Sequence, residues 1–165
     1  MTSEKELYGQ AQLLLDNFRH RSLTLISAES CTGGLIIAYL TEISGSSDVI
    51  EGGFVTYSNA AKSSMLGIDE QVIAEHGAVS KQVARAMAEG ALNRSVADVA
   101  IATTGVAGPS GGSAEKPVGL VHFAVARRGA ATLHSEKHFG DIGRHNVRLE
   151  SVATAFDLAQ QIAAG

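Results

Sequence analysis

The segment ISAESCTGGL, residues 26–35, marks the point where a short apolar run gives way to a glycine-containing turn and then to a helix. The run 23–28 is typical of a strand buried inside a sheet. After the glycines, apolar residues recur at helical spacing to about Ile43. We therefore expect a helix that contains Gly33 and Gly34 in its first turn and whose free amides point outwards.

Strands and helices alternate along the rest of the chain. Further helices are predicted over residues 3–20, 59–67 and 143–163, and another begins after the N-cap residue Ser80. Further strands are predicted over 49–58, with a glycine bulge, and over 97–105, 120–126 and 131–139. The last two strands should form a hairpin, so we predict an α/β fold whose sheet is mixed but mostly parallel.

Helical spacing also predicts which residues face the core. In the first helix these are Leu7, Ala11, Leu14 and Phe18, and in the helix after Ser80 they are Val83, Met87 and Ala91. Asn59 and Gly67 are the expected caps of the helix 59–67.

Composition excludes several classes of protein. The chain has 165 residues, enough for one domain over 1–165 with a sizeable core. Its net charge of −4 offers no basic surface for nucleic acid, although a small anionic ligand is compatible with it. A single cysteine can form no internal disulfide, the amino terminus lacks a signal-peptide pattern, and no apolar run approaches the roughly 20 residues that span a bilayer. We expect a cytoplasmic protein that does not associate with membranes.

Two segments should meet at one edge of the sheet. Parallel strands place ligands beyond their carboxyl ends, and both ESCTGG (29–34) and the glycine-rich TTGVAGPSGG (103–112) follow predicted strands. The second loop is too long for a simple turn, which favours a functional role, although it contains no nucleotide-binding glycine motif. Its amides could hold an anion, or the loop could be a structural lid.

Ser30 lies in the first of these segments, where its hydroxyl could act as a nucleophile beside amides that stabilise an oxyanion. The alternative is that Ser30 or Thr32 is simply a helix cap. A nucleophilic serine needs a base, and no histidine has a pattern that predicts this role. Lys62, in the first turn of the helix 59–67 and near Tyr57, is the other candidate, because burial and the helix dipole would favour its neutral form. Otherwise Lys62 is a solvated lysine at a helix start.

Other constellations carry less weight. The stretch SAEK (113–116) fits an SxxK motif, but Pro117 disfavours the helix that this motif requires. Cys31 is expected to be a buried packing residue. Arg144 and Arg148 lie four residues apart near the start of the last helix, where they could bind a phosphate or carboxylate or simply extend to solvent. No metal-binding motif is present.

Five blocks resemble the CinA carboxyl-terminal domain family, in order and over nearly the whole chain. They are AESCTGGL (28–35), GGFVTYSNAAKSSMLG (52–67), HGAVS (76–80), TTGVAGPSGGSAEKPVGLV (103–121) and RHNVR (144–148). The resemblance implies a three-layer α/β/α sandwich, a homo-oligomer and nicotinamide-nucleotide amidase activity of the PncC type. Such an enzyme converts nicotinamide mononucleotide to nicotinate mononucleotide and ammonia, and the resemblance implies no metal or other cofactor.

The resemblance also implies roles for individual residues. The serine nucleophile of the family falls on Ser30 and its lysine on Lys62, with Tyr57 beside them. Substrate-binding positions fall on Thr104, Gly105, Arg144 and Arg148. For the oxyanion we expect amides around Thr32 and Gly33, together with Gly105.

The sequence departs from the family pattern in two respects. Gly143, and not the more usual Asp, precedes Arg144, so the role of Arg148 is better supported. The longer CinA proteins carry an amino-terminal domain similar to molybdopterin-binding folds, which this sequence does not include, and we expect no pyrophosphatase activity linked to that domain. The alternatives to the amidase are hydrolysis of another amide or phosphate compound, and a catalytically silent nucleotide-binding sensor or scaffold linked to DNA uptake or recombination.

Overall fold

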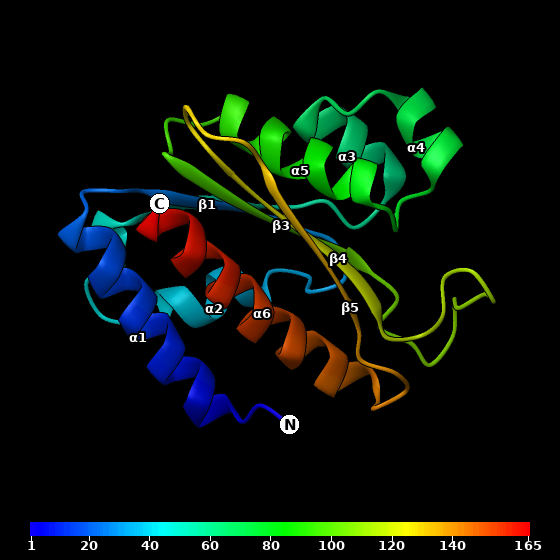
Figure 1. Cartoon of the computed structure of the whole chain (residues 1–165), viewed down its shortest axis with the longest axis horizontal. Helices are drawn as coiled ribbons and strands as arrows, with labels where there is room; N and C mark the ends of the chain where they lie inside the picture. The colour runs from blue at the N-terminus through cyan, green and yellow to red at the C-terminus, as the bar shows by residue number, and fades with distance from the viewer.

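In the computed structural model, which describes residues 1–165, one five-stranded sheet lies between two layers of helices (Figure 1). The strands are β1 (Leu25–Glu29), β2 (Ile50–Val55), β3 (Val99–Gly105), β4 (Leu120–Arg127) and β5 (Leu133–His138). Their order across the sheet is β2-β1-β3-β4-β5. β1 pairs in parallel with β2 and β3, whereas the β3–β4 and β4–β5 pairs are antiparallel. The predicted α/β class, the mixed sheet and the hairpin are confirmed.

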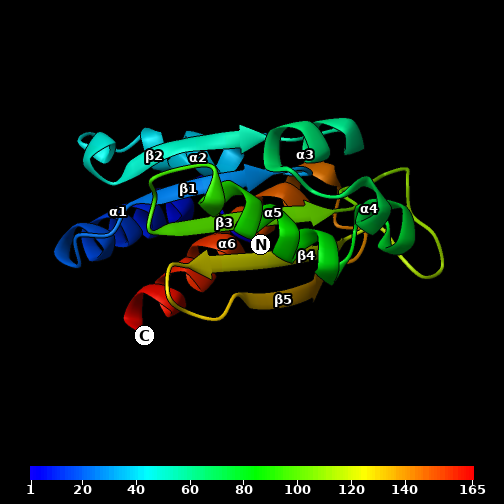
Figure 2. The same cartoon turned by 90° about the horizontal axis from the view of Figure 1, so that it is seen from above.

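The helices form the two outer layers of a three-layer sandwich. They are α1 (Glu4–His20), α2 (Leu35–Thr41), α3 (Asn59–Leu66), α4 (Glu70–His76), α5 (Lys81–Asn93) and α6 (Arg144–Ala164). Helices α1, α2 and α6 cover one face of the sheet, and α3, α4 and α5 lie on the other (Figures 1 and 2). None of the helices combines the length and the apolarity that crossing a lipid bilayer requires.

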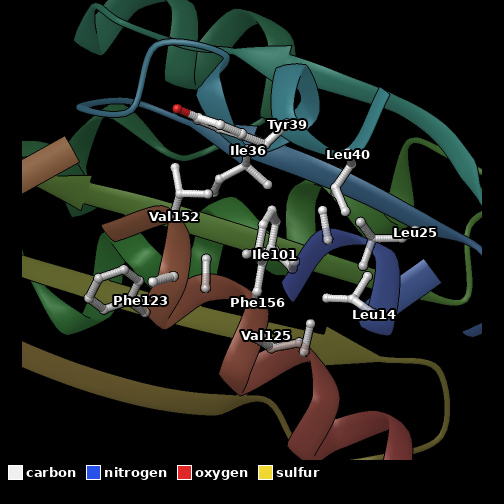
Figure 3. Packing of buried hydrophobic residues seen from close by; sticks show 14 of the residues in the cluster. Leu14, Leu25, Ile36, Tyr39, Leu40, Ile101, Phe123, Val125, Val152 and Phe156 are labelled. Carbon is white, nitrogen blue, oxygen red and sulfur yellow. The ribbon is translucent and has the colours of Figure 1, made fainter. Parts of the chain in front are cut away.

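The larger part of the core lies between the sheet and the layer formed by α1, α2 and α6. Figure 3 shows Phe156 of α6 among Ile101 and Val125 of the sheet and Leu14 of α1. The predicted core residues of the first helix and of the helix after Ser80 are all fully buried, as are Val152, Ala155 and Ala159 on the inner side of α6. Burial of these apolar stripes holds the helices on the sheet.

On the opposite face of the sheet, most of the buried side chains are alanines. Ala28, Ala100, Ala102, Ala124 and Ala126 form this surface, and α5 packs directly on it. Gly90 of α5 in turn allows a close approach of α3, because a Cβ there would lie 2.4 Å from the main-chain oxygen of Leu66. This contact fixes the position of α3, the helix that carries Lys62.

Several predicted boundaries change in the structure. The N-cap of α3 is Ser58, whose hydroxyl accepts a hydrogen bond from the Ala61 amide, and not Asn59, which is the first helical residue. Gly67 ends this helix in the left-handed conformation, as predicted. The glycine bulge is also confirmed, since Leu25 pairs with Ile50 but Ile26 pairs with Gly52.

The carboxyl ends of the three parallel strands, β1, β2 and β3, lie at one edge of the sheet. The turn after β1, the start of α3, the glycine-rich loop after β3 and the start of α6 gather there (Figure 2). The two segments predicted to share this edge, 29–34 and 103–112, therefore do so.

Candidate active site

The turn after β1 holds Ser30 at the end of the strand. Its amide donates to the main-chain oxygen of Thr103 in β3 (3.0 Å), and its carbonyl accepts from the Gly33 amide (3.0 Å). Gly33 and Gly34 have φ angles of +58° and +99°, which residues with a side chain rarely adopt. The glycines thus form a tight turn before the helix, and α2 begins only at Leu35. The expectation that they belong to the first helical turn is wrong.

Lys62 is the hydrogen-bond partner of Ser30. Its Nζ lies 3.0 Å from Ser30 Oγ and donates to the main-chain oxygen of Thr56, also at 3.0 Å. The Thr56 amide donates to the Glu29 carbonyl (2.8 Å), so the chain leaving β2 is tied to the end of β1. This bond and the α3–α5 contact bring Lys62 to Ser30 across 32 residues of sequence.

The surroundings of Lys62 disfavour its charged form. The side chain is 1% exposed, and the ion pairs of the protein involve other residues. Burial lowers the pKa of Lys62 below its ordinary value, because an ammonium group loses its hydration there. Lys62 belongs to the first turn of α3 and its amine reaches to Thr56, before the helix start, where the helix dipole also opposes positive charge. A neutral amine beside a hydroxyl is a pair that can transfer a proton.

Glu29 occupies the amides that the sequence suggested would be free. Its carboxylate is fully buried and accepts hydrogen bonds from the amides of Gly34 (2.9 Å), Ile36 (3.1 Å) and Ile37 (3.1 Å). The Ser27 hydroxyl donates to the same group (3.0 Å). A carboxylate at a helix N-terminus is stabilised by the helix dipole as well as by these donors. The start of α2 therefore carries its own anion and is not available to a ligand.

The amides nearest to Ser30 divide into two groups. Those of Gly33 and Gly34 are committed to Ser30 and Glu29. Those of Cys31 and Thr32 donate to no acceptor of another residue. The hydroxyl of Thr32 shares a hydrogen bond of 2.8 Å with that of Thr103. Of the amides in this turn that were expected to hold an oxyanion, the one at Thr32 is free and the one at Gly33 is not.

Two arginines from the start of α6 reach this edge of the sheet. Arg148 Nε donates to the Cys31 carbonyl (3.2 Å), and its Nη2 donates to the Thr32 carbonyl (3.0 Å). Arg144 donates to the Gly108 carbonyl in the glycine-rich loop (2.9 Å) and to the hydroxyl of Tyr57 (2.7 Å). Tyr57 is 62% exposed. The four segments at the edge of the sheet are thus joined by arginine side chains.

Thr104 and Gly105 have other contacts. The buried Thr104 hydroxyl donates to the Ala78 carbonyl (2.8 Å), which anchors the segment before α5. At Gly105 a Cβ would lie 2.7 Å from the main-chain oxygen of Leu120, so the glycine permits β3 and β4 to pair closely. The structure brings Lys62 to the turn of residues 30–34, which contains Ser30 and is called the nucleophile turn below. The Thr104 side chain instead contacts the segment before α5.

Cys31 and the histidines have surroundings unlike those of Lys62. Cys31 belongs to the core, and burial raises the pKa of its thiol to about 12, which disfavours the thiolate. His122 and His134 contact each other at 3.0 Å between ring nitrogens, on β4 and β5. The Ser30 hydroxyl has Lys62 as its partner, and no histidine bonds to it.

The family model of the CinA C-terminal domain, which is a sequence pattern, matches residues 8–163 of this chain. The chain belongs to the CinA C-terminal domain family. It is 44% identical over 160 residues to the nicotinamide-nucleotide amidohydrolase PncC of Escherichia coli, and the match covers 96% of both chains. It is 50% identical over 163 residues to a CinA-like protein of Syntrophus aciditrophicus, and covers 98% of this chain but 38% of that one. The chain spans 26% to 38% of the length of such longer relatives.

Solved structures of CinA proteins share the fold. The competence/damage inducible protein CihA of Agrobacterium tumefaciens has a TM-score of 0.91 at 50% identity, covering 96% of this chain and 94% of that one. A CinA superfamily protein of Escherichia coli has a TM-score of 0.90 at 32% identity, covering 100% and 94%. The order of layers described above is therefore that of the family.

Sequence reasoning missed Glu29, which holds α2, and Thr103 and Thr56, whose carbonyls hold Ser30 and Lys62. A signal for Glu29 was present, because a carboxylate four residues before the Gly33-Gly34 pair stands within reach of the amides that begin the next helix. Carbonyl partners leave no such signal, because every residue has a carbonyl.

Proposed function

We propose that the protein hydrolyses nicotinamide mononucleotide to nicotinate mononucleotide and ammonia, with Ser30 as nucleophile and Lys62 as base. The observation that carries this proposal is the distance of 3.0 Å between Lys62 Nζ and Ser30 Oγ, in a setting where burial lowers the lysine pKa. The PncC relatives, which are named nicotinamide-nucleotide amidohydrolases, support the choice of substrate.

In the first half of the reaction, Ser30 Oγ attacks the carboxamide carbon and its proton passes to the neutral Lys62 amine. The negative charge that develops on the carboxamide oxygen is stabilised by the free amides of Cys31 and Thr32; such a donor typically contributes about 3 kcal/mol. The carbon–nitrogen bond then breaks, Lys62 returns the proton to the leaving nitrogen, and ammonia departs. A nicotinoyl ester on Ser30 remains.

In the second half, water attacks the ester carbonyl. Lys62 accepts a proton from the water and then returns it to Ser30 Oγ as the ester bond breaks, which releases the nicotinate product and restores the enzyme. The Thr56 carbonyl keeps the amine in place throughout, because it accepts a hydrogen bond from Nζ in either protonation state.

The phosphate of the nucleotide would be bound near the start of α6. Arg144 is exposed and lies between Tyr57 and the glycine-rich loop, so its guanidinium can exchange its present partners for phosphate oxygens. Amides of residues 105–112 would add to this contact. Binding the phosphate there would orient the nicotinamide ring against Ser30. Free nicotinamide should therefore be a poor substrate.

Ammonia release from nicotinamide mononucleotide by the purified protein tests the proposal. Ser30→Ala and Lys62→Met should each abolish release, whereas Lys81→Met, which removes an exposed lysine from the start of α5, should leave it unchanged. Loss in Cys31→Ala together with retention in Ser30→Ala would overturn the mechanism. Tight nucleotide binding without ammonia release would favour the sensor.

A further inference from the structure

Arg148 holds two peptide units that follow Ser30 in the chain, the unit between Cys31 and Thr32 and the unit between Thr32 and Gly33. Its guanidinium donates to consecutive carbonyls, those of Cys31 and Thr32, from 116 residues or more along the chain. The approach is close, since a Cβ on Gly33 would lie 3.3 Å from Arg148 Nη2. Such a forked contact uses two donors of one rigid group and so fixes the orientation of the backbone that it binds.

This contact also sets the direction of the free amides. The peptide bond between Cys31 and Thr32 is trans, so the Thr32 N–H points away from the carbonyl that Arg148 binds. The preceding peptide unit is fixed in the same way, because the Ser30 carbonyl accepts from Gly33. Both peptide units that flank Cys31 are therefore held, and neither of their N–H groups donates to another residue.

We propose that Arg148 is a positioning residue for the nucleophile turn, and not the ligand of the substrate phosphate. Through the Cys31 carbonyl it fixes the Thr32 amide directly. Through the Thr32 carbonyl it fixes the Gly33 amide, which holds the Ser30 carbonyl and so orients the Cys31 amide. Arg148 thereby affects the transition state without touching the substrate, because donors that are already oriented stabilise the developing charge without reorganisation. This inference rests on the proposed amidase function and refines the sequence-based expectation that Arg148 binds substrate.

The two roles of Arg148 differ in their effect on two substrates. A phosphate ligand contributes only to nicotinamide mononucleotide, so its loss should raise KM for that substrate and leave nicotinamide riboside, which has no phosphate, unaffected. A positioning residue affects the chemical step with both substrates alike. Arg144, one turn away and exposed, provides the contrast within the same helix.

The experiment measures kcat and KM for both substrates in Arg148→Met, Arg148→Lys and Arg144→Met. The control is Arg85→Met, which removes a partly exposed arginine of α5. We expect Arg148→Met to lower kcat at least tenfold with both substrates and to change KM for the mononucleotide less than twofold. Arg148→Lys, which can still donate to one carbonyl, should recover part of the loss. A rise in KM above tenfold, confined to the mononucleotide, would overturn the inference.

Binding measurements separate this inference from the proposed function. If the wild type releases no ammonia from either substrate, the amidase proposal fails, and calorimetric titration with nicotinamide mononucleotide then decides the role of Arg148. Unchanged affinity in Arg148→Lys would support a structural contact to the turn, and loss of affinity would show a phosphate ligand. If circular dichroism shows that Arg148→Met is unfolded, the kinetic and binding results of Arg148→Lys alone decide between the two roles.

Discussion

Replacing Glu29 with glutamine should destabilise the protein strongly, although the two side chains have nearly the same shape. Glu29 Oε2 accepts from the Gly34 and Ile36 amides, and Oε1 accepts from the Ile37 amide and the Ser27 hydroxyl. A glutamine must place its NH2 group at one of these positions. The less costly choice is Oε1, because the serine hydroxyl can rotate and accept.

The magnitude follows from the bonds that remain. In that orientation the Ile37 amide faces an NH2 group, and a buried donor without a partner costs about 1–3 kcal/mol. The bonds to Gly34 and Ile36 remain but lose the assistance of the negative charge, at about 1 kcal/mol each. We expect a loss of about 3–5 kcal/mol, a large part of the total stability of about 5–15 kcal/mol of a typical domain.

Urea unfolding followed by circular dichroism measures this loss. With a slope near 2 kcal/mol per molar urea, the midpoint should fall by about 1.5–2.5 M. Glu42→Gln, an exposed change at the other end of α2, should shift the stability by less than about 0.5 kcal/mol. A loss below 1 kcal/mol in Glu29→Gln with an unchanged slope would refute the view that the carboxylate holds the start of α2.

Three further predictions concern titratable groups. Because Lys62 must be neutral to accept a proton and its pKa is lowered by burial, kcat/KM should fall tenfold per pH unit below a midpoint that lies under the ordinary value of 10.5; a profile without this limb would exclude the lysine as base. Cys31 should resist iodoacetamide in the native protein, because it is buried and its pKa is about 12, and rapid loss of the free thiol would contradict this. Burial lowers the pKa of His122, which is 7% exposed, so the unfolded state binds more protons and stability is lost as the pH falls below about 6.5; chemical unfolding between pH 7 and pH 5 should show a smaller loss in His122→Gln, and an equal loss would assign the effect to other groups.

The sequence alone determined the local structure and much of the core. Apolar residues at helical or strand spacing must face the interior wherever these elements pack, so the buried faces of α1, α5 and α6 follow from periodicity. The sequence also predicted a turn and a helix after β1, but it placed Gly33 and Gly34 inside the first helical turn, whereas α2 begins only at Leu35. The residue pattern also indicated Ser30 and Lys62 as a candidate nucleophile and base, and the resemblance to the family agreed with it.

Only the tertiary structure decided the contacts of the site. Lys62 reaches Ser30 because β2 lies beside β1 and α3 packs on α5. Neither arrangement can be predicted from the residues near Lys62. Arg148 reaches the nucleophile turn because α6, at the end of the chain, packs on the same face of the sheet as α2. Periodicity constrains only neighbours in sequence, whereas a hydrogen bond between distant residues depends on the order of strands and the packing of layers. Glu29 illustrates the difference. Its place before the glycine turn is compatible with a contact to the helix start, but only the fold shows that it is fully buried and which amides it binds.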